Sequence, residues 1–196
     1  MVDKCKKRGV QASAHGHGEY PTLATEAAAK VKSGKGPIII VGHSYGADAA
    51  VSMASEIEKL GAPVALLVLY GPTVEPLLIP SNVRAVVNYY QTGNAAWRAK
   101  ALPGPGFTGS INNVNLDKAD DVTHFNIEKV ERLQNQAMSR IVALTGTGRP
   151  IPIDTPTAAS TTATEAPAAT RASVKPAKST ASSKKSIEAP VSHNPL

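Results

Sequence analysis

The sequence predicts an α/β fold built on a mainly parallel sheet, because strand-like and helix-like segments alternate along it. Three apolar runs have the length of buried strands: Pro37–Val41, Val64–Tyr70 and Val83–Tyr90. Two segments have apolar residues at helical spacing, Thr22–Ser33 and Ala47–Leu60. Unbroken apolar strands are typical of sheets covered by helices on both faces, which predicts three layers.

The segments at the two ends of this pattern are less regular. Met1–Arg8 is predicted to be the end of a helix that stops at Gly9, and Val10–Ala14 to be a short strand. Gln91–Asn115 is rich in Gly, Pro and Asn and is predicted to be a long loop, a candidate lid because of its length. A last amphipathic helix is expected from Ile127 to Leu144.

Composition divides the chain into a folded part and a tail. Residues 1–147 are expected to form one domain, and 148–196 a disordered tail rich in Ala, Thr, Ser, Pro and Lys, with little apolar surface to bury. The net charge of +6 comes from residues scattered between the first turn and the tail. No aromatic residues are interleaved with these charges, so a nucleic-acid partner is not expected.

Cysteine content and hydropathy limit the remaining possibilities. The single cysteine, Cys5, excludes an intramolecular disulfide and a multi-cysteine metal site. No apolar stretch approaches the roughly 18 residues that span a bilayer. The first residues are charged and no apolar segment follows them, so no signal peptide is expected to begin at Met1. If Met1 is the true start, a cytoplasmic protein is expected; if an upstream signal peptide is missing, export is the alternative.

The most informative motif is Gly42-His43-Ser44-Tyr45-Gly46, which directly joins a predicted strand to a predicted helix. In this context G-x-S-x-G indicates a nucleophile elbow, a strained turn that exposes the serine between a central parallel strand and a helix. Both glycines are expected to be needed because a Cβ at either position would clash. The Tyr45 N–H would face an oxyanion, and His43 would shape the pocket. A plain structural turn is the alternative.

A serine nucleophile needs a base, and the histidines are the candidates. Only His124, in VTHFNI after the last predicted strand, fits the order serine, acid, histidine. A surface histidine that caps the last helix is the alternative. His15, His17 and His43 would be the imidazoles of a metal site, but no carboxylate lies at ligand spacing, so no metal is expected.

GHSYGAD and the later VTHFNI resemble motifs of the α/β-hydrolase superfamily, and more narrowly of bacterial thioesterase- and lipase-like hydrolases, over roughly Val10–Leu144. The segment HGHGEY resembles an R-G-H-G segment of the same fold. The resemblance implies hydrolysis of a small-molecule acyl ester or thioester without a cofactor. Ser44 would attack the carbonyl, His124 would take its proton, and Tyr45 N–H would form half of the oxyanion hole.

The chain departs from that pattern at the catalytic acid. The resemblance implies a carboxylate where Gly71 stands. Glu75, on the same loop, and Asp117, beside the segment that carries His124, are the main candidates for the orienting acid. Asp120 and Asp121 lie in the same segment and are further candidates. A site without any acid is the remaining possibility. Asp48, in the elbow helix, is expected to make a structural contact instead.

The resemblance also implies a strand and a glycine-containing loop ahead of Val10. The sequence is therefore expected to be a fragment that lacks the first strand or strands of a three-layer α/β-hydrolase-like sheet, together with the second oxyanion donor. A weak or inactive hydrolase is expected from these departures. The alternative is a non-catalytic α/β-hydrolase-like pseudoenzyme or fragment that acts as a binding domain. The sequence leaves the oligomeric state open.

Overall fold

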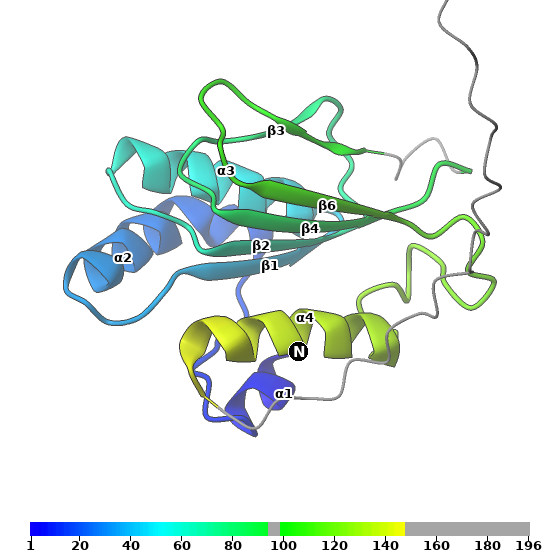
Figure 1. The fold of residues 1–196 in the computed structure, drawn as a ribbon, viewed down its shortest axis with the longest axis horizontal. Helices are drawn as coiled ribbons and strands as arrows, with labels where there is room; N and C mark the ends of the chain where they lie inside the picture. The colour runs from blue at the N-terminus through cyan, green and yellow to red at the C-terminus, as the bar shows by residue number, and fades with distance from the viewer. Residues whose placement is uncertain (94–98, 148–196) are drawn as a thin grey trace, which may run out of the picture. The chain divides into compact units, whose positions relative to one another are not determined.

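The computed structural model describes residues 1–93 and 99–147, which have mixed α/β structure (Figure 1). The tail predicted over 148–196 lies outside the described residues. The helices are α1 (Val2–Lys6), the 3-10 helix η1 (His17–Glu19), α2 (Tyr20–Lys32), α3 (Tyr45–Lys59) and α4 (Glu131–Thr145). The strands are β1 (Ile39–His43), β2 (Leu66–Tyr70), β3 (Leu77–Ile79), β4 (Ala85–Tyr90), β5 (Ala101–Pro103) and β6 (Ser110–Asn115).

A four-stranded sheet with the order β1-β2-β4-β6 is the centre of this part of the chain, and its neighbouring strands are all parallel. The short strands β3 and β5 pair separately, also in parallel. The sequence predicts a central elbow strand, and this is wrong for the described residues: β1 lies at the edge and pairs with β2 alone. The parallel α/β class itself is confirmed.

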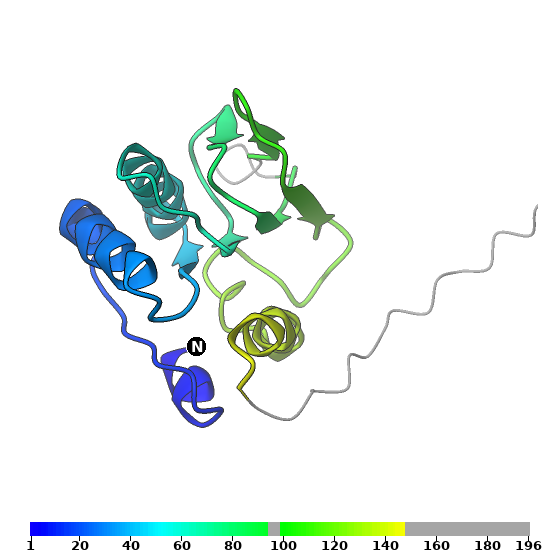
Figure 2. The ribbon, with the colours of Figure 1, turned by 60° about the vertical axis from the view of Figure 1, so that its left-hand side comes forward.

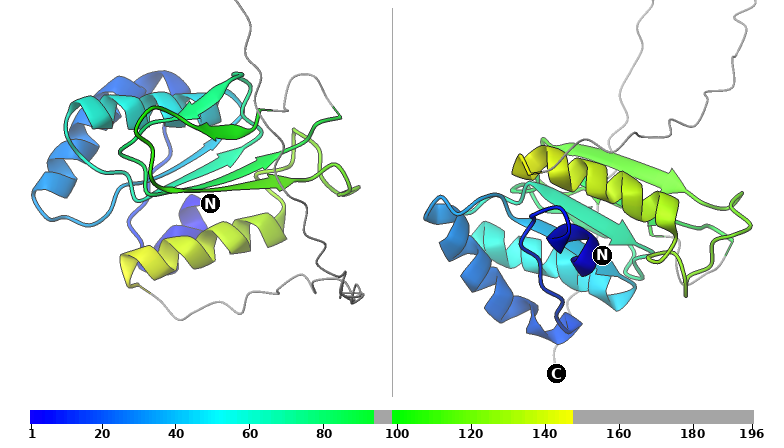
Figure 3. Two further views of the ribbon diagram at one scale, coloured as in Figure 1. Left: turned by 45° about the horizontal axis from the view of Figure 1, so that its top comes forward. Right: turned by 90° about the horizontal axis from the view of Figure 1, so that it is seen from below.

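Helices cover both faces of the sheet (Figures 1 and 2). Helices α2 and α3 lie against one face, and α1 and α4 against the other, as the view from below also shows (Figure 3). The alternating side chains of β2 supply both cores: Leu67 and Leu69 pack toward α2 and α3, whereas Val68 and Tyr70 pack toward α4. Because both faces are covered, β2 is an unbroken apolar run, as the sequence predicts.

Two predictions made outside the apolar runs are wrong. Val10–Ala14 forms no strand, although Val10 and Ala12 still pack against the core between the sheet and α4. The loop predicted over Gln91–Asn115 contains β5 and β6. Strand β6 has no apolar pattern by which it could be predicted, because it is an edge strand whose side chains are exposed or half-buried.

Asparagine side chains hold β6 and β5 together in place of apolar contacts. Asn113 accepts a hydrogen bond from Ala101 N at 2.9 Å and donates to Ala101 O at 2.9 Å. It also accepts from Nδ2 of the fully buried Asn88 on β4 at 2.9 Å. One exposed side chain therefore connects the edge strand to β5 and to a buried polar group.

The last helix begins later than predicted. Ile127 is buried, as its place in the apolar pattern requires, but it lies in turns that precede α4. The extended backbone of Val130 (φ −61°, ψ 116°) separates these turns from the first residue of the helix, Glu131. The segment that carries His124 is therefore a folded loop, distinct from the helix.

Replacement of Asn113 by alanine is expected to lower the free energy of unfolding by about 1–2 kcal/mol, because three hydrogen bonds, one to a buried amide, lose their partner. Asn112→Ala, on the opposite face of the same strand, is the matched control and is expected to stay within about 0.5 kcal/mol of the parent. Urea unfolding of both variants measures the difference. Equal midpoints would contradict the assigned role of Asn113.

Candidate functional site

Ser44 lies on a sharp turn between β1 and α3, as the sequence predicts. Its backbone angles are φ 55° and ψ −127°, and within residues 1–93 and 99–147 it is the one residue other than glycine with a positive φ. Such a conformation costs about 1–3 kcal/mol and persists only where neighbours hold it. The Ser44 N–H donates to Tyr70 O of β2 at 2.9 Å, which holds the turn against the neighbouring strand.

The two glycines of the motif have different roles. A Cβ at Gly42 would lie 2.2 Å from Gly46 O, so the strand can approach the helix this closely only because Gly42 has no side chain. A Cβ at Gly46 would meet no atom within 4 Å. The prediction that both glycines are sterically required is therefore wrong for Gly46.

The imidazole of His124 lies against the Ser44 hydroxyl. His124 comes from the loop between β6 and α4, and its Nε2 is 3.0 Å from Ser44 Oγ. A turn stabilises this loop, in which Asn126 Oδ1 accepts from Thr123 N and Ile127 N donates to Thr123 O. His124 is only 7% exposed, so the pair is shielded from solvent on the side of the imidazole.

Burial and a neighbouring imidazole set the protonation of His124. Desolvation, followed by the charge of His43, lowers the pKa of His124 to about 4, while Glu128 acts in the opposite direction. At neutral pH the imidazole is therefore uncharged and able to accept the proton of the Ser44 hydroxyl.

Tyr45 follows the nucleophile as the first residue of α3. The N–H groups of a first helical turn have no acceptor within the helix, so the Tyr45 N–H is suited to bind an oxyanion there. The Tyr45 side chain is 67% exposed, and its ring centroid is 6.3 Å from that of His17 in η1.

His43 lies on the other side of the base and contacts it directly. Its ring centroid is 4.9 Å from that of His124, and its Nε2 donates to the backbone oxygen of His124 at 2.8 Å. The same Nε2 is 3.5 Å from Oε2 of Glu128. The sequence motifs do not include Glu128. It lies in the turns between His124 and α4, where the sequence has no regular pattern that would mark it.

Gly71, at the end of β2, lies against the far edge of the base. A Cβ at this position would be 2.9 Å from Nδ1 of His124, and the residue has a φ of 56°. Gly71 stands where the resemblance implies an acid. It faces Nδ1 of His124, the ring nitrogen to which such an acid would bond.

The two candidate acids have different surroundings. Asp117 accepts hydrogen bonds from Thr92 N at 2.6 Å, from Thr92 Oγ1 and from Asn115 Nδ2 at 2.9 Å. Hydrogen bonds from Thr92 and Asn115 lower the pKa of Asp117 to about 2. Glu75 lies on the loop after β2, next to a cis bond to Pro76. The roles of Asp117 and Glu75 as the orienting acid stay predictions.

Asp48 makes the structural contact predicted for it. From the first turn of α3 its carboxylate accepts from Thr73 N at 2.9 Å, from Thr73 Oγ1 and from Val74 N at 3.2 Å. The loop after β2 is thereby tied to the helix that follows the nucleophile.

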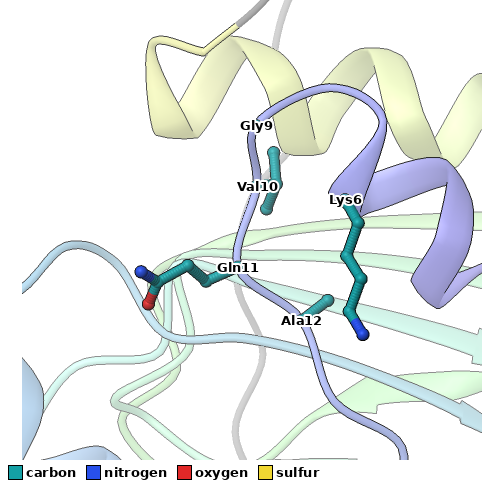
Figure 4. Close-up of a pocket in the computed structure, with 5 residues that line it drawn as sticks. All are labelled: Lys6, Gly9, Val10, Gln11 and Ala12. Carbon is teal, nitrogen blue, oxygen red and sulfur yellow. The ribbon is translucent and has the colours of Figure 1, made fainter.

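A cavity of about 330 Å³ lies away from these residues, lined by Lys6, Gly9, Val10, Gln11 and Ala12 (Figure 4). All five belong to the N-terminal segment that runs from the end of α1 into the following loop. In the part of the chain that the structure describes, no three His, Cys, Asp or Glu side chains gather closely enough to hold a metal ion.

No protein-family model, curated protein or solved structure matches the chain significantly. None of the helices found in residues 1–93 and 99–147 has the length and hydropathy needed to cross a membrane.

Replacement of Gly42 by alanine is expected to lower the free energy of unfolding by about 3 kcal/mol or more, because the new methyl group would overlap backbone atoms of α3. Gly46→Ala is the matched variant. It is expected to leave stability unchanged or to raise it by up to about 1 kcal/mol, as alanine favours a helix. Denaturant unfolding measures both; equal losses would contradict the close approach at Gly42.

Proposed function

We propose that this chain is a serine hydrolase that cleaves ester or thioester bonds through an acyl-enzyme on Ser44. The observation that carries the proposal is a serine in a strained turn with its Oγ 3.0 Å from the Nε2 of a buried histidine. A turn made only for structure has no need of the positive φ at Ser44 or of the imidazole beside it. The α/β-hydrolase superfamily is the proposed family, on the motifs GHSYGAD and VTHFNI.

The reaction follows from the roles of these groups. Ser44 Oγ attacks the carbonyl carbon as its proton passes to His124 Nε2, and the resulting oxyanion accepts a hydrogen bond from Tyr45 N–H. The tetrahedral intermediate then expels the alcohol or thiol, which leaves with the proton held by His124. Water then attacks the acyl-enzyme as its proton passes to His124 Nε2. The second tetrahedral intermediate releases the carboxylic acid, and Ser44 Oγ takes the proton back from His124.

The surroundings of the site favour an apolar acyl group. Tyr45 follows the nucleophile and Phe125 follows the base, and their side chains are 67% and 78% exposed. The ring of Phe125 meets that of His124 edge-on, with centroids 5.7 Å apart. Val74, on the loop held by Asp48, is also exposed. These side chains would cover the acyl chain of a bound ester and lose exposed apolar surface.

A fluorophosphonate probe is expected to label the parent protein on Ser44 and to leave Ser44→Ala unlabelled. His124→Asn is expected to label about a hundredfold or more slowly, because the serine loses its base. Ser52→Ala, whose hydroxyl bonds to Asp48 O within α3, is the control and should label at the parent rate. Labelling is followed by intact mass and peptide mapping. A parent protein that does not react would favour the non-catalytic binding domain.

The acid limb of kcat/KM for a soluble butyrate ester is expected to have its midpoint near pH 4, well below the usual 6.5 of histidine. Lowering the pH through this midpoint protonates His124, which then no longer accepts the serine proton. Activity regained on return to pH 7 serves as the control for unfolding. A midpoint near 6.5 would contradict the buried, uncharged state of the base.

A further inference from the structure

We infer that Glu128 is the carboxylate that positions the base of this site, and that it acts through the side chain of His43. The inference rests on the proposed function, for which the resemblance implies an acid where Gly71 stands. It assigns the positioning role to a residue four positions after the base, on the same loop.

Contacts connect the three residues in a chain. Glu128 Oε2 is 3.5 Å from His43 Nε2, which donates to His124 O at 2.8 Å. The carbonyl accepts, so Nε2 of His43 carries the hydrogen, and the same N–H group faces the carboxylate. The two imidazole rings lie 4.9 Å apart. His43 thus holds the backbone of the base, while the negative charge of Glu128 holds His43.

The other contacts of Glu128 leave its Oε2 to face the imidazole of His43. Its Oε1 faces the exposed Lys129 Nζ at 3.5 Å, and its main-chain oxygen accepts from Gln134 Nε2 of α4 at 2.7 Å. Oε2 is buried and, among the described residues, has no hydrogen bond of normal length. Burial of a carboxylate oxygen costs free energy unless a neighbouring hydrogen-bond donor or positive charge offsets its negative charge.

The charges that face the base agree with this assignment. His43, from β1, lowers the pKa of His124, and Glu128 raises it. Lys129 lies beside the carboxylate on the loop itself. Burial, followed by Tyr89 and Glu128, raises the pKa of Tyr70 of β2. When Ser44 attacks, His124 becomes positively charged, and Glu128 offsets that charge in the transition state.

The test uses Glu128→Gln, which keeps the shape and removes the charge, with Glu131→Gln as the matched control. Glu131 is an exposed carboxylate three residues further along, paired with Lys4 at 3.6 Å and outside the site. Glu128→Gln is expected to slow fluorophosphonate labelling of Ser44 about tenfold or more, since a lost orienting carboxylate costs up to about 10⁴-fold in direct contact. Glu131→Gln should label at the parent rate.

A second pair of variants separates positioning from folding. His43→Leu removes the donor to His124 O and is expected to slow labelling as Glu128→Gln does. His43→Gln, whose amide N–H reaches about as far as Nε2, should recover part of the rate. Thermal unfolding checks that each variant is folded. Slow labelling in His43→Leu without any recovery in His43→Gln would overturn the assigned hydrogen bond.

NMR titration of the histidines measures the effect of Glu128 on His124 without any need for catalysis. Loss of the Glu128 charge should shift the titration of His124 to lower pH than in the parent and in Glu131→Gln. If the parent fails to label, the proposed function falls, while the titration still decides whether Glu128 acts on His124. Titration and labelling that are equal in Glu128→Gln and Glu131→Gln would overturn the inference.

Discussion

The strained backbone of Ser44 is the constraint on which the rest of the site depends. A φ of 55° turns the chain from β1 into α3 within one residue, so the serine side chain is held at the carboxyl end of the strand. The absence of a Cβ at Gly42 permits the turn, and the hydrogen bond from Ser44 N to Tyr70 O fixes it on the neighbouring strand. The loop that carries His124 then has only to reach this edge of the sheet for His124 Nε2 to meet Ser44 Oγ. The strain is offset by packing in the sheet and helix.

Carboxylates fix the loops around this sheet in one recurring way. Each accepts two hydrogen bonds from one residue, from its N–H and from its hydroxyl: Asp48 from Thr73, Asp117 from Thr92, and Glu58 from Ser81. The first two hold the loops that follow β2 and β4, at the same end of the sheet as Ser44. A loop held in this way loses little conformational entropy when a ligand binds, because its order is already present. Glu128 differs from these carboxylates, since its Oε2 faces the imidazole of His43.

Apolar runs and motif context predict the parallel α/β class and the meeting of Ser44 with His124. The apolar runs are enough to predict β2 and β4, because both strands are buried on both faces and are therefore largely apolar along their length. Strand β6 is hidden from such a pattern, since Asn113 holds it through hydrogen bonds in place of apolar contacts. Glu128 is hidden for a different reason: it lies in a loop without periodicity, and only the three-dimensional path of that loop brings it to His43. The edge position of β1 depends on pairing between distant segments, which local sequence does not encode.

The central claim is that Ser44 is a nucleophile and His124 its base. Rapid acid quench after mixing the protein with p-nitrophenyl butyrate at pH 7, followed by peptide mapping, tests it most directly. The account predicts one butyryl group on the peptide that contains Ser44, formed much more slowly in His124→Asn and absent in Ser44→Ala. Butyryl groups found only on lysines, or formed on Ser44 at the same rate in His124→Asn, would contradict it.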